Sequence, residues 1–218
     1  LGNPGDEYAA TLHNVGQMVI DHLAKRHNVK LSTHKSRTDI AAYKLGVGVD
    51  AHSIILAQSK SYMNESGGPT KALADFYKVE TLKIIIIHDE LDLPFNALRI
   101  KQGGGDNGHN GLKSLTASLS TSDYYRIRMG IGRPIGDQDP ADFVLKQFAK
   151  DEKKSLVFAD SELIRQCCIL IIENVKKFVG EDLPLEISIL TSEWRVSIEF
   201  RDKGKGFSSE AADHLFEL

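Results

Sequence analysis

Hydrophobic and polar residues follow two patterns along the chain, one helical and one extended. Apolar residues at helical spacing predict amphipathic helices at 11–29, 67–77, 112–119 and 155–178. Runs rich in β-branched and apolar residues predict strands at 40–49, 53–57, 82–87, 97–101 and 124–131. The run 82–87 contains four consecutive isoleucines, which is typical of a buried central strand. Strands that alternate with helices predict one three-layer α/β domain with a mixed, largely parallel sheet.

The two ends of the chain differ from this middle part. The chain opens on the turn Leu1-Gly2-Asn3-Pro4-Gly5 with no strand before it, so we expect that the first strand of the sheet is missing. Beyond the last predicted helix the composition changes, and two further strands are predicted at 185–190 and 194–200. We therefore divide the chain into a domain at 1–180 and a C-terminal tail at 181–218, whose origin the sequence leaves open.

Composition and charge exclude several classes of protein. Of the 218 residues, 41% are hydrophobic and 26% are charged, which provides for one core and excludes a disordered or collagen-like chain. No apolar run approaches the roughly 20 residues of a membrane span. The only cysteines, Cys167 and Cys168, are adjacent, which excludes a disulfide framework and a cysteine zinc site and suits a reducing cytoplasm. A net charge of −3 excludes a globally basic nucleic-acid binder but leaves room for a local basic patch.

The acidic segment His88-Asp89-Glu90-Leu91-Asp92 directly follows the predicted central strand. Residues at the carboxyl end of such a strand face the crevice in which α/β proteins bind ligands, although an acidic loop that caps the strand fits the same residues. No second histidine stands at metal-ligand spacing, so no metal site is predicted. The glycine stretch 103–108 satisfies G-x-G-x-x-G, but no acidic residue ends the next strand, so no dinucleotide cofactor is predicted.

Three residue pairs occur at predicted junctions between strands and helices: His13-Asn14, Met63-Asn64 and His109-Asn110. A histidine, whose ordinary pKa is about 6.5, is the usual general base at neutral pH. An asparagine amide donates hydrogen bonds to a developing oxyanion without adding charge. One such pair is commonly surface or turn chemistry, whereas three at comparable junctions favour a shared reaction site.

These residues lie in motifs that resemble those of the bacterial-type peptidyl-tRNA hydrolase family. The opening turn at 1–5, Tyr8 and His13-Asn14-Val15-Gly16 resemble the first motif of the family. The later motifs follow in family order and with family spacing at 61–67, 88–94, 103–113 and 125–134. The resemblance extends from Leu1 to about residue 180.

The resemblance implies hydrolysis of the ester bond between peptide and tRNA in peptidyl-tRNA, which recycles tRNA from stalled translation. It also implies tRNA as the partner, no cofactor, no metal, no membrane contact and a cytoplasmic monomer. By resemblance His13 is the catalytic base and Asp89 its partner, because a carboxylate on one ring nitrogen leaves the other free to take a proton from water. The remaining site residues implied are Asn3, Tyr8, Met63, Asn64 and Asn110 for substrate, and Lys101 and Arg128 for a tRNA phosphate.

Some features depart from the family pattern and leave other functions open. Asp106-Asn107 replaces residues that in the family are commonly His or Ser followed by Gly, which brings an acid into the glycine loop. A catalytically silent RNA-binding relative, similar to plant organelle splicing factors of this fold, is the alternative function. In the tail, 202–206 resembles part of the Asp-x-Gly-x-Gly box of histidine-kinase-type ATPase domains. Because the asparagine-bearing helix and the lid of such domains are not found, ATP binding is not predicted.

Overall fold

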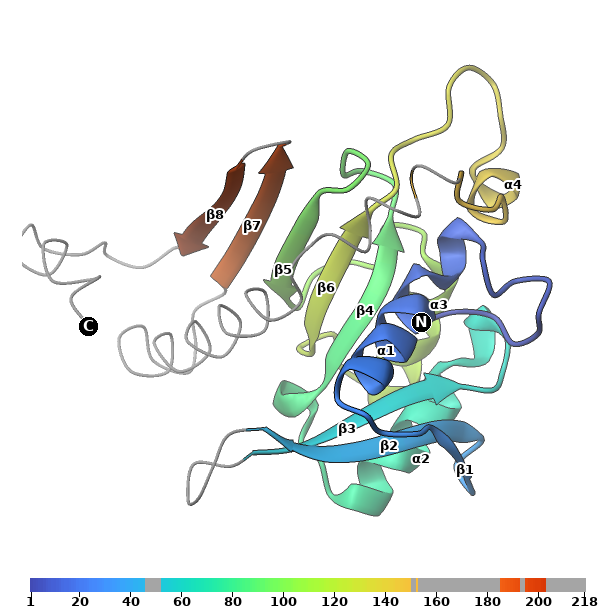
Figure 1. The fold of residues 1–218 in the computed structure, drawn as a ribbon, viewed down its shortest axis with the longest axis vertical. Helices are drawn as coiled ribbons and strands as arrows, with labels where there is room; N and C mark the ends of the chain where they lie inside the picture. The colour runs from blue at the N-terminus through green and yellow to red at the C-terminus, as the bar shows by residue number, and fades with distance from the viewer. Residues whose placement is uncertain (46–51, 150–151, 153–184, 193–194, 203–218) are drawn as a thin grey trace, which may run out of the picture.

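The computed structural model describes residues 1–45, 52–149, 152, 185–192 and 195–202 (Figure 1). The helices are α1 (Val15–Arg26), α2 (Gly67–Tyr77), α3 (Asn110–Leu119) and α4 (Pro140–Val144), and short 3₁₀ turns lie at Leu12–Asn14, Met63–Glu65 and Thr81–Lys83. The strands are β1 (Ser32–His34), β2 (Thr38–Leu45), β3 (His52–Ser59), β4 (Ile85–Glu90), β5 (Leu98–Gln102), β6 (Tyr125–Gly130), β7 (Leu185–Ser192) and β8 (Arg195–Asp202).

Most of the predicted helices and strands are confirmed, with shifts at their ends. The helix α2 has the predicted bounds, and the strands predicted at 97–101 and 124–131 are β5 and β6 within one residue of each bound. The strand β4 begins three residues later than predicted, because Thr81–Lys83 form a 3₁₀ turn instead. It was predicted as a central strand, but it stands at one end of the order of described strands, with both faces covered by helices. The helix predicted at 155–178 lies outside the described residues.

Two short elements were not predicted. The strand β1 has three polar residues and no apolar alternation, and only its pairing with β2 makes it a strand. The helix α4 has a sequence signal that we did not use: Pro140 stands at its first turn, and the Asp139 side chain accepts a hydrogen bond from the Ala141 N–H. Its five residues are too few for helical periodicity to be visible.

The described strands form two sheets, and the pairing directions correct one prediction. β1, β2 and β3 form an antiparallel sheet, and the second sheet has the order β4-β6-β5-β7-β8. Within the described residues only β4 and β6 pair in parallel, so the prediction of a largely parallel sheet is wrong although a mixed sheet is confirmed. The reason is that β5 runs antiparallel between β6 and β7, whereas simple strand–helix–strand units would have made it parallel.

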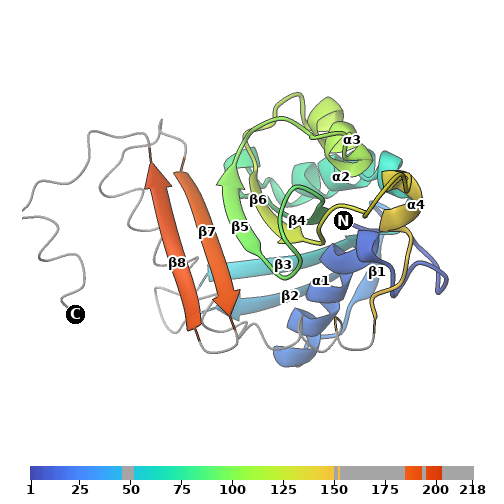
Figure 2. The same cartoon turned by 90° about the horizontal axis from the view of Figure 1, so that it is seen from above.

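Apolar residues on both faces of β4 build the core in three layers. Ile87 packs on one face with Leu12 and Val15, which precede or begin α1. Ile86 packs on the other face with Leu112 and Leu115 of α3. Successive residues of a strand point to opposite faces, so a continuous apolar run is needed where both faces are covered. Figure 2 shows α1 and α3 on opposite sides of the sheet.

The two strands predicted in the tail are confirmed, and they extend the larger sheet. β7 pairs with β5, placing Glu186 opposite Lys101 in the register, and β8 pairs with β7 (Figure 1). The ATPase-like segment begins at Asp202, the last residue of β8, and otherwise lies outside the described residues. Among the helices in the described part of the chain, none has the length and hydrophobicity that a bilayer crossing requires.

Candidate active site

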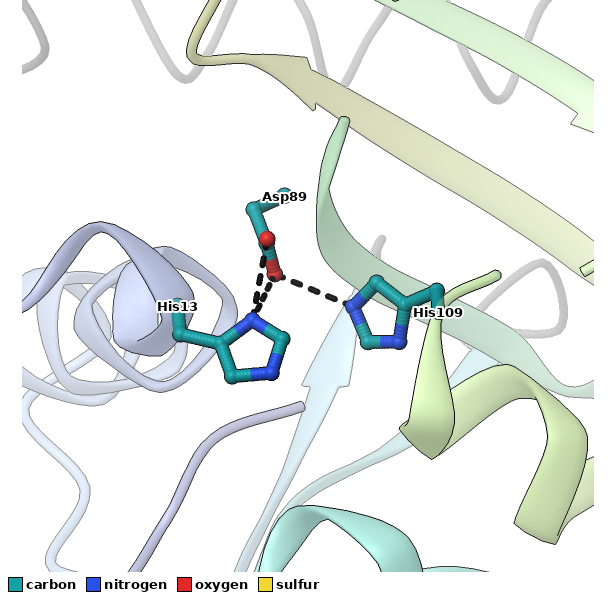
Figure 3. Close-up of side chains that lie close together, drawn as sticks. All are labelled: His13, Asp89 and His109. Carbon is teal, nitrogen blue, oxygen red and sulfur yellow. Dashed lines mark hydrogen bonds and ion pairs between the residues drawn. The ribbon is translucent and has the colours of Figure 1, made fainter. Parts of the chain in front are cut away.

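Two histidines converge on one buried carboxylate near the end of β4 (Figure 3). The His13 Nδ1 atom lies 2.9 Å from both carboxylate oxygens of Asp89, and the His109 Nε2 atom lies 3.0 Å from Oδ1. The side chain of Asp89 is 3% exposed, that of His109 8% and that of His13 12%. His13 is thus the most open of the three groups, although all three meet in a largely dry site.

Local structure explains why three distant segments meet here. His13 lies in the 3₁₀ turn Leu12–Asn14 that leads into α1, and Asp89 lies near the carboxyl end of β4. Gly16 allows α1 to approach the strand closely, since a Cβ at this position would lie 2.3 Å from the Ile87 carbonyl oxygen. His109 precedes α3 and caps its N-terminus. The site therefore joins one residue from each of the three layers.

The hydrogen bonds determine the protonation pattern of both rings. His109 Nδ1 accepts the Gly111 N–H at 3.1 Å and the Leu112 N–H at 3.4 Å, as a helix-capping acceptor does. In the neutral ring the proton is then on Nε2, which donates to Asp89. By the same logic His13 donates from Nδ1 to Asp89, and its Nε2 has no hydrogen-bond partner among the described residues. The free nitrogen of His13 is the one that can accept a proton.

Asp89 is held in its ionised form. Burial raises the pKa of this carboxyl, but the interactions with His109 and His13 lower it by more, so that the pKa lies well below its usual range. Hydrogen bonds that stabilise a carboxylate favour its charged form over the protonated one. A fixed negative charge therefore faces both imidazole rings at neutral pH.

The first two motifs are joined by a buried asparagine pair. The Asn3 Oδ1 atom accepts the Met63 N–H at 2.8 Å. The Asn14 side chain accepts the Asn3 N–H and donates to the Asn3 carbonyl, both at 2.8 Å. Met63 is 4% exposed, and its sulfur lies close to Gly111, where a Cβ would come within 2.6 Å. The structure thus brings Asn3 and Met63 together with the start of α3.

The other predicted substrate residues, Asn64, Asn110 and Tyr8, are less buried than Asn3 and Met63. Asn64 is exposed in the 3₁₀ turn after Tyr62, and Asn110 is exposed at the first position of α3. Tyr8 makes an edge-to-face contact with Tyr62, with 6.5 Å between ring centroids. Tyr62, which is 55% exposed, was not predicted as a site residue.

The predicted phosphate residues line a second, basic pocket. Lys101 of β5 and Arg128 of β6 share this pocket with Arg126, Glu90 and His88. Arg126 is buried and donates to the carbonyls of Gly104 and Gly105 at 2.7 Å and 2.6 Å, which holds the glycine loop against the sheet. The positive φ angles of 66° at Gly103 and 100° at Gly104 are readily adopted by glycine, so the loop can turn sharply there.

Four residues of these two sites were given no role from the sequence: Asn14, Glu90, His109 and Arg126. Asn14 and His109 stand in the residue pairs at predicted junctions, and Glu90 stands in the acidic segment, but their partners were not predicted. His109 stands directly before a predicted helix, where an acceptor side chain caps the first N–H groups, and this signal could have been used. The partners of Glu90 and Arg126 could not be read from the sequence, since they lie 38 and 21 residues away from the groups they bind.

Within the described part of the chain, the three residues of the first site also form a group whose atoms could hold a metal ion. One ligand atom from each of His13, Asp89 and His109 lies within 4.8 Å of the others. These same atoms stand at 2.9 to 3.0 Å, the ordinary length of a direct N–H···O hydrogen bond. Direct hydrogen bonds between these atoms are thus sufficient to hold the three side chains together and to orient the His13 ring.

The fold is a mixed α/β fold in which a buried carboxylate orients a histidine, an arrangement that occurs in many hydrolases. The family model described as peptidyl-tRNA hydrolase matches residues 1–182, and the chain belongs to this family. The peptidyl-tRNA hydrolase of Frankia casuarinae is 54% identical over 156 residues, which cover 72% of this chain and 77% of that protein. That of an Arthrobacter species is 50% identical over 158 residues, which cover 72% and 80%.

Solved structures agree with the family assignment. The crystal structure of peptidyl-tRNA hydrolase from Acinetobacter baumannii is similar to this chain with a TM-score of 0.70 and 30% identity. The similarity covers 81% of this chain and 88% of that one.

Proposed function

We propose that this peptidyl-tRNA hydrolase cleaves the ester between peptide and tRNA with His13 as general base and a water molecule as nucleophile. The observation that carries this proposal is the 2.9 Å contact between His13 Nδ1 and Asp89, which leaves Nε2 as the proton acceptor. When His13 takes a proton from water, the ring becomes cationic next to an ionised carboxylate. The charge of Asp89 stabilises this cation, so the transition state gains more than the ground state.

Asparagine amides would position the substrate around this base. The Oδ1 atom of Asn3 is engaged by Met63, so its amide N–H₂ group is the end that can face a substrate carbonyl. Asn64 and Asn110 are exposed and would supply further neutral donors for the peptide or the developing oxyanion. Tyr8 would offer ring surface against which the peptide can pack, and Met63, which is buried, would shape the site from beneath.

Lys101 and Arg128 would hold a phosphate of the tRNA. They come from adjacent strands and line one pocket, and a guanidinium and an ammonium together suit a phosphate group. This contact explains how a chain of net charge −3 engages RNA, since the positive charge is local. The substrate is made during translation, so we infer that the protein acts in the cytoplasm, and one copy of the chain supplies every residue of the proposed mechanism.

The test is release of peptide from an N-blocked aminoacyl-tRNA by the purified chain. We expect His13→Ala to lower kcat by about 10²- to 10⁴-fold, the usual contribution of a positioned general base, with little change in tRNA binding. His22→Ala is the matched control, because His22 is an exposed histidine of α1. Unchanged turnover in the His13 variant would remove this residue from the mechanism. Absence of turnover in the unmodified chain, with tRNA binding retained, would favour the silent RNA-binding alternative.

A further inference from the structure

The basic pocket lies on the opposite face of β4 from the His13–Asp89 pair. Asp89 and Glu90 are consecutive strand residues and point to opposite faces of the sheet. On the Glu90 face, the pocket collects the charged side chains of Lys101, Arg126 and Arg128. Among the described residues that line it, Glu90 is the only carboxylate.

Both oxygens of Glu90 are already occupied by neighbouring groups. The Oε2 atom accepts from Arg128 Nε at 3.0 Å and from the Asn107 amide at 3.5 Å, and Oε1 accepts the Asp92 N–H at 3.1 Å. The side chains of Glu90 and Arg128 are 6% and 13% exposed, so this ion pair is largely shielded from water. A shielded carboxylate interacts more strongly with its neighbours than one on the surface, because solvent and salt screen it less.

The other groups in the pocket leave its charge unbalanced. Burial, with a smaller contribution from the electrostatic interaction with His109, lowers the pKa of His88 from 6.5 to about 3, so this ring is neutral at pH 7. The two terminal nitrogens of Arg126 donate hydrogen bonds to carbonyls of the glycine loop, and its Nε has no partner within the described part of the chain. Three cations therefore line the pocket with one carboxylate, and Asp106 of the adjoining loop also acts on Arg126. An anion that enters the pocket is attracted by the cations and repelled by Glu90.

We propose that Glu90 is an internal counter-ion that limits how tightly the Lys101–Arg128 pocket holds an RNA phosphate. The proposal rests on the assignment of that pocket to a tRNA phosphate in the proposed function. A contact that is equally strong in substrate, transition state and product raises affinity without speeding the chemical step. If the pocket bound the phosphate more tightly, the deacylated tRNA would also dissociate more slowly, and product release commonly limits turnover. The buried carboxylate of Glu90 lowers the affinity for the phosphate, and its hydrogen bond keeps Arg128 in position.

The test is binding of deacylated tRNA to the full chain across a range of salt concentrations. We expect Glu90→Gln to bind tRNA about threefold to tenfold more tightly, because one shielded repulsion is removed. The slope of log K against log salt should become steeper by up to about one unit. Glu80→Gln makes the same change in net charge at an exposed residue paired with Lys83, and we expect it to leave affinity and slope unchanged. A variant that is merely damaged in structure would not gain affinity.

Two further variants separate the possible failures. Equal or weaker tRNA binding by Glu90→Gln, with Arg128→Gln weakening it, would overturn the counter-ion role and leave the phosphate contact standing. If Arg128→Gln leaves tRNA binding unchanged, the phosphate contact itself is wrong. If Glu90→Gln does not fold, Asn107→Asp tests the same charge balance from the exposed loop and should weaken binding. Unchanged binding in that variant would also overturn the proposal.

Discussion

Asp89 and Glu90 are neighbours on β4, yet they serve two regions of the molecule with different electrostatics. Asp89 faces His13 and His109, whereas Glu90 faces Arg128 and Asn107. Both carboxylates are buried and both accept several hydrogen bonds. They differ in their partners, which are imidazole rings on one face and a permanent guanidinium cation on the other.

This difference determines what each carboxylate can do. Each imidazole ring reaches Asp89 through a single ring nitrogen and carries no permanent charge, so the charge of Asp89 can stabilise His13 when His13 takes up a proton. Arg128 is always cationic and cancels the charge of Glu90 at close range. The comparison teaches that burial and hydrogen bonding alone do not identify a reactive carboxylate. The charge state of its partners does.

The largest effect, on kcat, is expected when the charge of Asp89 is removed. Asp89→Asn keeps the shape of the side chain but no longer fixes the tautomer of His13 or stabilises its cation. We expect kcat to fall by about 10²- to 10⁴-fold on peptidyl-tRNA and equally on a short N-blocked ester without the tRNA body. Steady-state kinetics on both substrates is the measurement. A loss confined to the tRNA substrate would show that Asp89 serves binding, as proposed for the Glu90 face.

A smaller effect, on the pH dependence of stability, is expected from His88, the residue that precedes both carboxylates. The folded-state pKa of His88 is about 3, below its unfolded value of 6.5, mainly because burial disfavours the charged ring. The unfolded chain therefore binds the proton first, so stability is fully present above pH 6.5 and is lost as pH falls towards 3. The loss is about 1.4 kcal/mol per pH unit.

Urea unfolding at pH 7 and pH 5 measures this loss. We expect the unmodified chain to lose ~2 kcal/mol more than His88→Gln between these two pH values. His22→Gln, at an exposed position of α1, should follow the unmodified chain. The depressed pKa of Asp89 acts with the same sign, but only as pH falls below the ordinary value of 3.8. Parallel pH profiles for the chain and His88→Gln would show that folding does not lower the pKa of His88.

The smallest effect, a modest loss of kcat, is expected at His109, the second imidazole partner of Asp89. His109→Asn removes the hydrogen bond to Asp89, while asparagine is itself a good helix N-cap. We therefore expect kcat to fall by roughly tenfold, in keeping with one lost hydrogen bond to a charged group, with the melting temperature nearly unchanged. His109→Ala should show the same kinetic loss and also lose about 1 kcal/mol of stability with the cap. If His109→Asn keeps full kcat, then His109 only caps α3.

The sequence alone determined the local elements and the motif residues. The bounds of α2 and the strands β5, β6, β7 and β8 were predicted closely, because each depends on apolar periodicity or β-branched runs within the segment itself. His13 and Asp89 were also predicted as partners through the resemblance to a family, although they lie 76 residues apart. The described structure agrees with this pairing.

Only the tertiary structure decided how these pieces combine. The direction of β5 is set by its neighbours β6 and β7, which no local pattern of β5 encodes. The sequence shows that Asp89 and Glu90 face opposite ways, since side chains alternate along a strand. It does not show that β6 lies beside β4 and brings Arg128 to Glu90, or that the start of α3 brings His109 to Asp89. Strand order and helix packing are long-range choices, and they alone determine which partner each carboxylate meets.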